Sequence, residues 1–249
     1  MKENKTQFPT EEVTLPSKGL LYPKNSSLSK GFIEMKYMTA REEDILTNEN
    51  YIENGTVIDK LLQSLIISSI DYNELLLGDK NAVLVAARIL GYGSDYSFEY
   101  RGDSITLDLT EVNDKYLDES LVNNGKNEFS FTLPTSKVNI TFKLLTHGDE
   151  QKIDQELKGL KKINKKSSST ISTRMKHIIT SVNGDYENKT IREFVDNTLL
   201  AIDSRALRNY IFEIQPNVDL TFDYENRKGD IERIDIPIGL KFFWPDASV

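Results

Sequence analysis

The sequence lacks cysteine altogether, and this absence excludes disulfides, thiolate zinc sites and cysteine nucleophiles. Its only histidines are His147 and His177, so a histidine-rich metal site is excluded as well. No apolar run approaches the length of about 18 residues that spans a bilayer, and the N-terminus lacks the apolar segment of a signal peptide. We therefore expect a soluble cytoplasmic protein with no metal, no cofactor and no membrane partner.

Positive charge is also scarce. The chain of 249 residues has 31 lysines and arginines against 39 aspartates and glutamates, which gives a net charge of −8. Such a chain has no overall attraction to nucleic acid or to anionic lipid. The lysines between Lys158 and Lys166 could touch phosphate, but they are also the solvated end of a predicted helix that begins with acidic residues. We expect no nucleic-acid partner.

Motifs of catalysis are missing too. The sequence has no glycine-rich phosphate loop, no serine-centred elbow and no metal-ligand spacing. Pairs of carboxylates such as Glu42 and Glu43 could serve a hydrolase, but they are abundant in any acidic protein. His177 has no poised nucleophile near it in the sequence. The sequence therefore predicts a protein that is not an enzyme.

Helical periodicity is clearest between residues 57 and 91. Apolar residues recur at intervals of three and four from Val57 to Ile70, which predicts a helix with one buried face. Asp79 stands where the N-cap of a second helix would lie. Before this pair, Thr39 and Glu42 have the spacing of a capping box. We expect the two helices to lie antiparallel and to form the centre of the core.

Residues 1–37 are predicted to form an extended N-terminal arm. Prolines and glycines between Pro16 and Gly31 forbid a long helix. Leu20, Leu21 and Tyr22 are the apolar anchors of this arm. It could pack along its own domain or lie on another subunit, because extended peptides add readily to exposed surfaces. Alternation over residues 32–37 indicates a short strand.

Alternating apolar residues predict β-hairpins over 96–109, 128–145 and 220–238, and a further strand over 171–183. Further helices are expected from Gly148, from Thr190 to about Leu200, and from a cap at Ser204 to a stop at Pro216. The last hairpin, FDY…GD…IDIPI, echoes FEY-RGD-SITLDL at 98–109. This echo indicates a duplicated helix-plus-hairpin unit.

These elements predict an α+β fold with a helical core pair and β-hairpins. We divide the chain into the arm at 1–37, a lobe with the helix pair and hairpins at 38–147, and a second helix and hairpin lobe with an aromatic C-terminus at 148–249.

Several residues are candidates for binding a partner. Arg88 is the one cation in the apolar run AVLVAARIL, and it either lies at the edge of the buried stripe or anchors a partner. Phe242, Phe243 and Trp244 either plug the core or form an exposed anchor. With the arm residues, the candidate partner-binding set is Leu20, Leu21, Tyr22, Arg88, Phe242, Phe243 and Trp244.

Four segments together resemble the bacteriophage T4-type baseplate protein family, whose members take part in building the baseplate hub of contractile tails. The segments are LPSKGLLYP (15–23), MTAREEDIL (38–46), LLLGDKNAVLVAARILGYGSDY (75–96) and IPIGLKFFWP (236–245). Some relatives carry Cys-x-x-Cys knuckles in hairpins of this type, where this chain reads Tyr100-Arg101-Gly102-Asp103 and Tyr224-Glu225-Asn226-Arg227. A zinc role is therefore not expected here.

The resemblance implies a non-enzymatic assembly factor or chaperone that promotes formation of the baseplate hub. Its partners would be phage baseplate hub proteins, and it would act in the host bacterial cytoplasm. The alternative is a permanent structural subunit of the baseplate or hub. Which hub subunits are bound, and in what oligomeric state, stays open at this stage.

Overall fold

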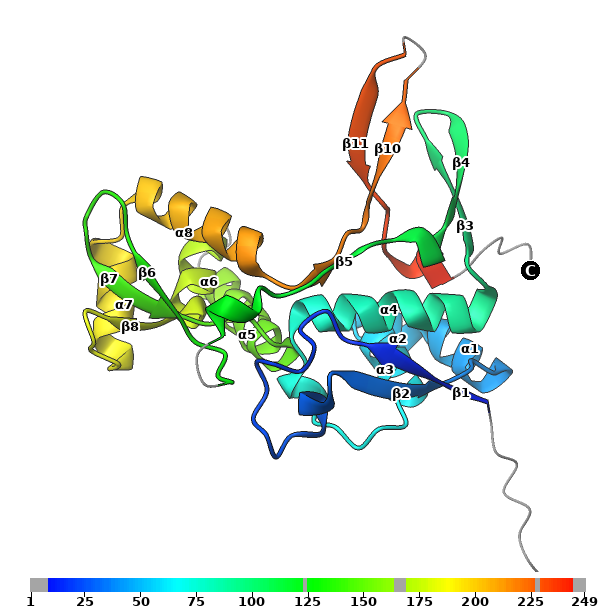
Figure 1. Cartoon of the computed structure of the whole chain (residues 1–249), viewed down its shortest axis with the longest axis horizontal. Helices are drawn as coiled ribbons and strands as arrows, with labels where there is room; N and C mark the ends of the chain where they lie inside the picture. Colours follow the sequence, from blue (N-terminus) through cyan, green and yellow to red (C-terminus); the bar gives the residue numbers. More distant parts are fainter. Residues whose placement is uncertain (1–8, 123–124, 164–168, 227–228, 244–249) are drawn as a thin grey trace, which may run out of the picture.

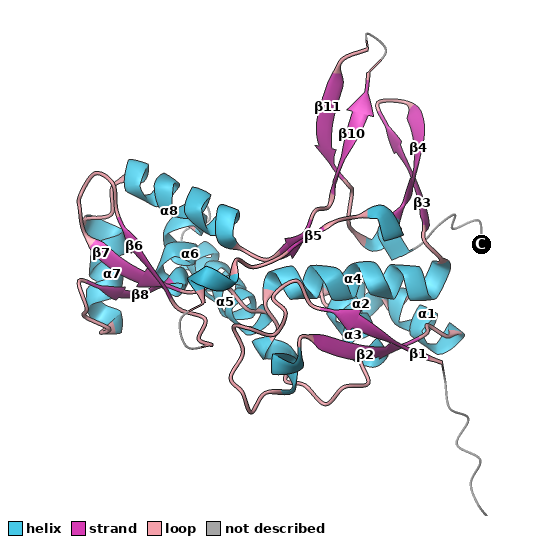
Figure 2. Cartoon of the chain, in the orientation of Figure 1, coloured by secondary structure: helices cyan, strands magenta, loops and turns pink. Residues whose placement is uncertain are grey.

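The computed structural model describes residues 9–122, 125–163, 169–226 and 229–243. They form an α+β fold, as the sequence predicts, in which helices alternate with small antiparallel sheets (Figures 1 and 2). The helices are α1 (Ala40–Leu46), α2 (Glu49–Glu53), α3 (Val57–Leu65), α4 (Leu77–Tyr92), α5 (His147–Ile163), α6 (Thr170–Ile178), α7 (Asn188–Asn197) and α8 (Ala201–Ile214), with 3-10 turns η1 (Ser27–Lys30), η2 (Tyr72–Glu74), η3 (Leu109–Glu111), η4 (Glu119–Leu121) and η5 (Leu240–Phe243). The strands are β1 (Thr10–Thr14), β2 (Phe32–Lys36), β3 (Asp95–Tyr100), β4 (Asp103–Asp108), β5 (Asp114–Lys115), β6 (Phe129–Thr132), β7 (Asn139–Phe142), β8 (Ile179–Val182), β9 (Asn217–Val218), β10 (Thr221–Glu225) and β11 (Ile231–Asp235).

The predicted N-terminal arm is folded into the body of the protein from Thr10 onward. β1 pairs with β2 antiparallel, and Leu15, Leu28 and Met35 are completely buried. Residues 1–8 of the arm lie outside the described residues. Of the two alternatives for the arm, its described part therefore packs along its own domain, because its apolar side chains complete the core of its own chain.

Helix α4 lies at the centre of the molecule, above β1, β2 and α1 to α3 and below the hairpins in Figure 1. The preceding helix α3 contacts it but ends at Leu65, short of the predicted Ile70. Ile66 adopts an extended conformation and bridges to Met35 of β2, so the backbone leaves the helix there. The N-cap of α4 is Leu76, and the predicted cap Asp79 lies buried in the first turn.

The capping box before α1 is confirmed. The Thr39 backbone N–H donates to Glu42 Oε2 at 3.0 Å, and the Thr39 hydroxyl donates to the same oxygen at 2.5 Å. Glu42 also accepts from Lys36 Nζ at 2.8 Å, which ties the end of β2 to the helix.

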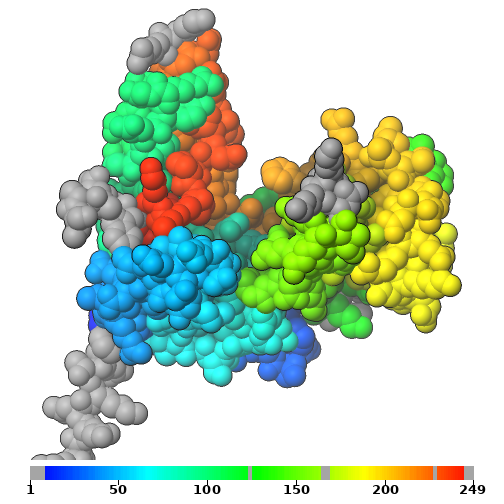
Figure 3. All heavy atoms as spheres, turned by 180° about the vertical axis from the view of Figure 1, so that it is seen from behind, coloured from blue at the N-terminus to red at the C-terminus, as the bar shows by residue number. Residues whose placement is uncertain are grey.

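The first and last predicted hairpins are confirmed and stand side by side above α4 (Figure 1). Arg101 and Gly102 both have positive φ angles, 52° and 86°, as a two-residue turn of this hairpin class requires. The ring of Phe98 packs against Phe222 with centroids 5.4 Å apart, and Tyr100 packs against Tyr224 at 5.0 Å. Seen from behind in Figure 3, this hairpin pair projects from the body, and a hollow separates it from the lobe that contains α5 to α8.

The middle hairpin, β6 and β7, is also confirmed, and β8 adds to its edge as a third strand. The predicted boundary at residue 147 divides this sheet, so the sheet does not follow the predicted lobes. The strand predicted over 171–183 is wrong for its first part, because residues 170–178 form α6 between α5 and α7. The β-branched composition favours a strand, but packing on two helices overrides that propensity. Helix α8 begins at Ala201, before the predicted cap Ser204.

Candidate interaction surfaces

Most of the predicted partner-binding residues are buried within the chain. Leu21 and Tyr22 are 3% and 5% exposed, and Phe242 and Phe243 are completely buried. Leu20 is half-buried. The four buried side chains pack the core because water exposure of large apolar groups is unfavourable, and Leu20 packs against that core. Trp244 lies outside the described residues.

Arg88 is also buried, which fits a structural role better than the role of a partner anchor. Its Nη1 donates to the Gly93 carbonyl at 2.7 Å and its Nη2 to the Asp95 carbonyl at 2.8 Å. Burial lowers the pKa of this guanidinium. Because the last carbonyls of a helix and of the loop beyond it need donors, Arg88 fastens the end of α4 to the start of β3.

A buried carboxylate holds the loop after β1 against α4. Asp79 accepts from the Ser17 backbone N–H at 2.9 Å, from the Ser17 hydroxyl at 2.6 Å and from the Tyr22 hydroxyl at 2.6 Å. The Tyr22 oxygen in turn accepts from the Leu76 N–H at 2.9 Å. Burial raises the pKa of Asp79, against the effect of these donors, and raises the pKa of Tyr22 as well. This network is structural, since its donors and acceptors satisfy one another.

The four segments that carry the resemblance in the sequence contact one another along α4. Besides the link from Tyr22 to Asp79, the Tyr92 hydroxyl donates to Glu43 at 3.1 Å. The Tyr96 hydroxyl donates to the Pro237 carbonyl at 2.8 Å. Four stretches that are far apart in the sequence therefore contribute to one contiguous framework centred on α4.

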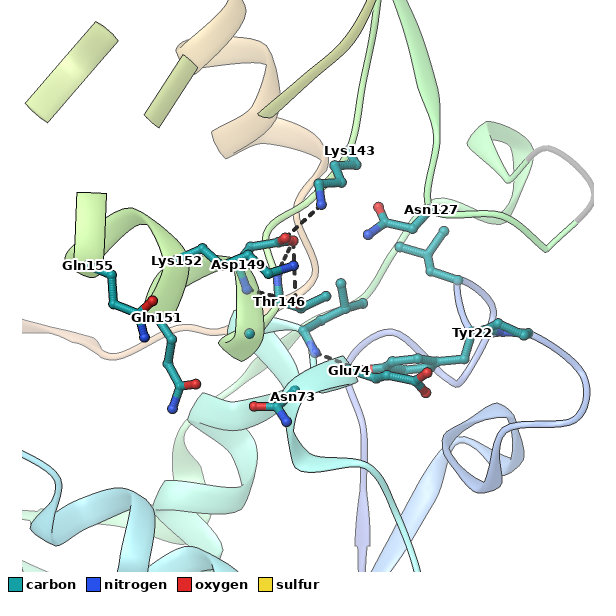
Figure 4. Close-up of a pocket in the computed structure, with 14 residues that line it drawn as sticks. Tyr22, Asn73, Glu74, Asn127, Lys143, Thr146, Asp149, Gln151, Lys152 and Gln155 are labelled. Carbon is teal, nitrogen blue, oxygen red and sulfur yellow. Dashed lines mark hydrogen bonds and ion pairs between the residues drawn. The ribbon is translucent and has the colours of Figure 1, made fainter. Parts of the chain in front are cut away.

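A polar cleft of about 710 Å³ opens beside this framework (Figure 4). Lys143 points toward Asp149, and their ion pair measures 2.7 Å. Asp149 also closes the capping box of α5, because it accepts from the Thr146 N–H at 3.3 Å. The side chains of Gln151 and Lys152 line the cleft from the same helix. Amides, a lysine and a paired carboxylate can hydrogen-bond a peptide or a protein surface.

The two histidines serve packing and ion pairing. His147 is buried under the edge of the Tyr72 ring, with centroids 4.6 Å apart, and burial and Lys80 lower its pKa. His177 lies 2.9 Å from Glu156, which also accepts two hydrogen bonds from Arg192. This network joins α5, α6 and α7.

Glu156 is the anion of this network. The hydrogen bond from Arg192, together with that from His177 and against the effect of burial, lowers the pKa of Glu156 to about 2. Within the described ranges, no group of three or more histidine, aspartate or glutamate side chains could hold a metal ion. No helix in the same ranges is long and apolar enough to cross a membrane.

Sequence reasoning missed the exposed apolar residues of the second half. Phe212 on α8 is 77% exposed, and Ile171 on α6 is 54% exposed. The signal was present in the helical period, because Phe212 falls outside the stripe formed by Leu207 and Ile214, which are buried.

Comparison with known proteins gave no further guide: no family model, no curated protein and no solved structure matches this chain.

Proposed function

We propose that the chain is a non-enzymatic factor that promotes formation of the baseplate hub of a contractile phage tail in the host cytoplasm. The supporting observation is that the four segments resembling the baseplate family contact one another around α4. A resemblance confined to scattered loops could arise by chance, whereas segments that build one framework support a shared fold. The partners would be hub proteins, without nucleic acid or membrane.

A binding role fits the accessible surfaces better than a chemical one. The polar cleft holds a lysine whose carboxylate partner is already engaged, and both histidines have structural partners. The projecting hairpin pair and the cleft offer hydrogen-bonding groups to a protein. A permanent subunit of the baseplate or hub would use the same surfaces and is the alternative.

The test is quantitative mass spectrometry of this chain in purified mature particles and in tail-assembly intermediates from infected cells. For a transient factor we expect absence from mature particles, enrichment in intermediates, and co-purification with hub proteins. A fixed whole-number copy count in mature particles would instead make the chain a structural subunit. Recovery of this chain in equal amounts from lysates that contain hub intermediates and from lysates that lack them would contradict both roles.

A further inference from the structure

The two halves of the chain, residues 9–115 and 128–243, repeat one plan. Each begins with a strand pair, and the first strand runs into its connection through Thr-Leu-Pro followed by serine or threonine, at Thr14–Ser17 and Thr132–Thr135. In each half a buried aspartate three residues after the N-cap of a long helix accepts from that connection. Asp79 accepts from the Ser17 N–H at 2.9 Å, and Asp203 accepts from the Thr135 N–H at 2.8 Å.

The capping boxes repeat as well. Lys36, Thr39 and Glu42 in the first half have the same spacing and contacts as Lys143, Thr146 and Asp149 in the second. The edge of each sheet is also extended in the same way, since Ile66 forms a single bridge to Met35 of β2 and Ile179 of β8 pairs with Phe142 of β7. A shared set of contacts of this kind indicates an internal duplication that extends well beyond the helix-plus-hairpin unit.

The duplication allows α4 and α8 to be compared position by position from their buried aspartates. Gly78 and Arg88 of α4 are buried, and their counterparts Ile202 and Phe212 of α8 are 62% and 77% exposed. Helix α4 is covered by the second half, where the Pro216 carbonyl lies against Gly78 and η5 packs on the helix. The equivalent face of α8 has no such cover among the described residues.

A groove of about 350 Å³ lies beside this uncovered face, between α6 and α8. Its lining includes Met175 and Ile178, which are buried, and Ile171 and Phe212, which are exposed. Its charged lining residues are all cations, in a chain of net charge −8: Lys143, Arg174 and Arg208.

One of these cations is free to meet an anion. Lys143 and Arg174 already pair with Asp149 and Glu150, both at 2.7 Å. Arg208 forms no ion pair with a carboxylate in the described part of the chain, and its Nε donates only to the Ser204 carbonyl, at 3.3 Å. A further cation, Lys115, lies 5.1 Å from the centroid of the Phe212 ring and donates one hydrogen bond to the Phe212 carbonyl at 2.5 Å. An exposed aromatic ring that has Lys115 against it and Arg208 in the same groove suits an apolar group that carries negative charge.

We propose that this groove binds an acidic amphipathic segment of a partner protein. An apolar side chain of the partner would sit between Ile171 and Phe212, and its carboxylates would meet Arg208 and Lys115. This site is independent of the proposed role in hub assembly, because it rests on the groove and its charges alone.

The test is selection of a displayed library of random peptides against the full chain, with the Phe212→Ala variant as the competitor in solution. We expect enrichment of peptides that combine glutamate or aspartate with apolar residues at helical spacing. The affinity of an enriched peptide, measured by fluorescence anisotropy, should fall about tenfold or more on Phe212→Ala and on Arg208→Glu. The same peptide with lysine in place of its acidic residues should not bind.

Two variants serve as controls. Arg205→Glu makes the same change in net charge as Arg208→Glu on the exposed face of α8 but lies outside the groove lining, and Ile231→Ala removes an exposed apolar side chain from β11. Both should bind the peptide as the wild type does. Enrichment of neutral or basic peptides, no enrichment, or equal affinity for all variants would overturn the proposal. A dimer that sediments for the wild type and is lost on Phe212→Ala would assign the groove to a second copy and overturn it too.

Discussion

At the scale of single residues, buried polar groups form the hydrogen bonds that hold distant segments of the chain together. Tyr22 and Asp79 are far apart in the sequence, and neither the spacing nor the residue type indicates that they meet. Helical periodicity predicts that α4 is buried but not that its first turn holds a carboxylate. The sequence therefore indicates that Tyr22 is an anchor but leaves open whether its contact lies within the chain or on a partner.

Tyr22→Phe tests this assignment. The change leaves Asp79 one donor short and the Leu76 N–H without its acceptor, in a buried place. We expect a loss of about 1–3 kcal/mol in the free energy of unfolding, measured by urea denaturation. Tyr37→Phe is the matched control, because the Tyr37 hydroxyl contacts Glu11 at 3.2 Å at an exposed site. Equal losses for both variants would contradict the role given to the Tyr22 hydroxyl.

Glu42 gives a prediction for pH. Burial opposes its ionisation, but hydrogen bonds from Lys36, Thr39 and Ser64 lower its pKa from the usual 4.5 to about 2. Because the folded-state pKa is below the unfolded one, the carboxylate stabilises the fold above pH 4.5, and this contribution is lost as the pH falls from 4.5 to about 2. We expect Glu42→Gln to cost about 1–2 kcal/mol at neutral pH, after allowance for solvent screening.

The measurement for Glu42 is urea unfolding of wild type and Glu42→Gln across this pH range. The two stabilities should converge as the pH approaches 2. A difference that stays constant from neutral pH to pH 2 would show that the cost of the substitution is one of packing and not of charge.

At the scale of elements, period and turn chemistry predicted the hairpins well, because a period of two and a positive-φ turn are local properties. The same reasoning failed at α6, where residues 171–178 carry β-branched side chains but lie between two helices. It also failed at the start of α8, since any of several polar residues could cap a helix and Leu200 occupies that position. Local patterns predict elements where tertiary contacts do not compete.

Two glycines within helices provide a matched test of close packing. A Cβ at Gly78 in α4 would lie 1.8 Å from the Pro216 carbonyl oxygen, whereas a Cβ at Gly159 in α5 would meet nothing within 4 Å. We expect Gly78→Ala to destabilise the protein by more than about 3 kcal/mol and Gly159→Ala to stabilise it by about 0.5–1 kcal/mol. Thermal unfolding monitored by circular dichroism measures both. An unchanged unfolding temperature for Gly78→Ala would mean that Pro216, the residue before β9, does not pack closely against α4.

At the scale of the whole molecule, the repeated halves are joined into one core. The second half contributes Pro216 and η5 to the cover of α4, and the hairpins of the two halves pack ring against ring. The sequence indicated the duplication through the two hairpins but could not indicate that one half covers the other. We therefore expect the two halves to unfold together rather than as separate lobes.

Phe242→Ala tests that coupling. Phe242 belongs to the second half, is completely buried, and packs on Tyr96 of the first half with ring centroids 4.9 Å apart. Removal of the ring leaves a cavity and should cost about 3–5 kcal/mol. Because η5 packs on α4, hydrogen exchange of the α4 amides should accelerate together with that of the second half.

Phe212→Ala is the control, and at a ring that is 77% exposed it should change stability by less than about 0.5 kcal/mol. Faster exchange confined to residues 128–243 in the Phe242 variant would mean that the halves are energetically separate, and that the cover over α4 adds no stability to the first half.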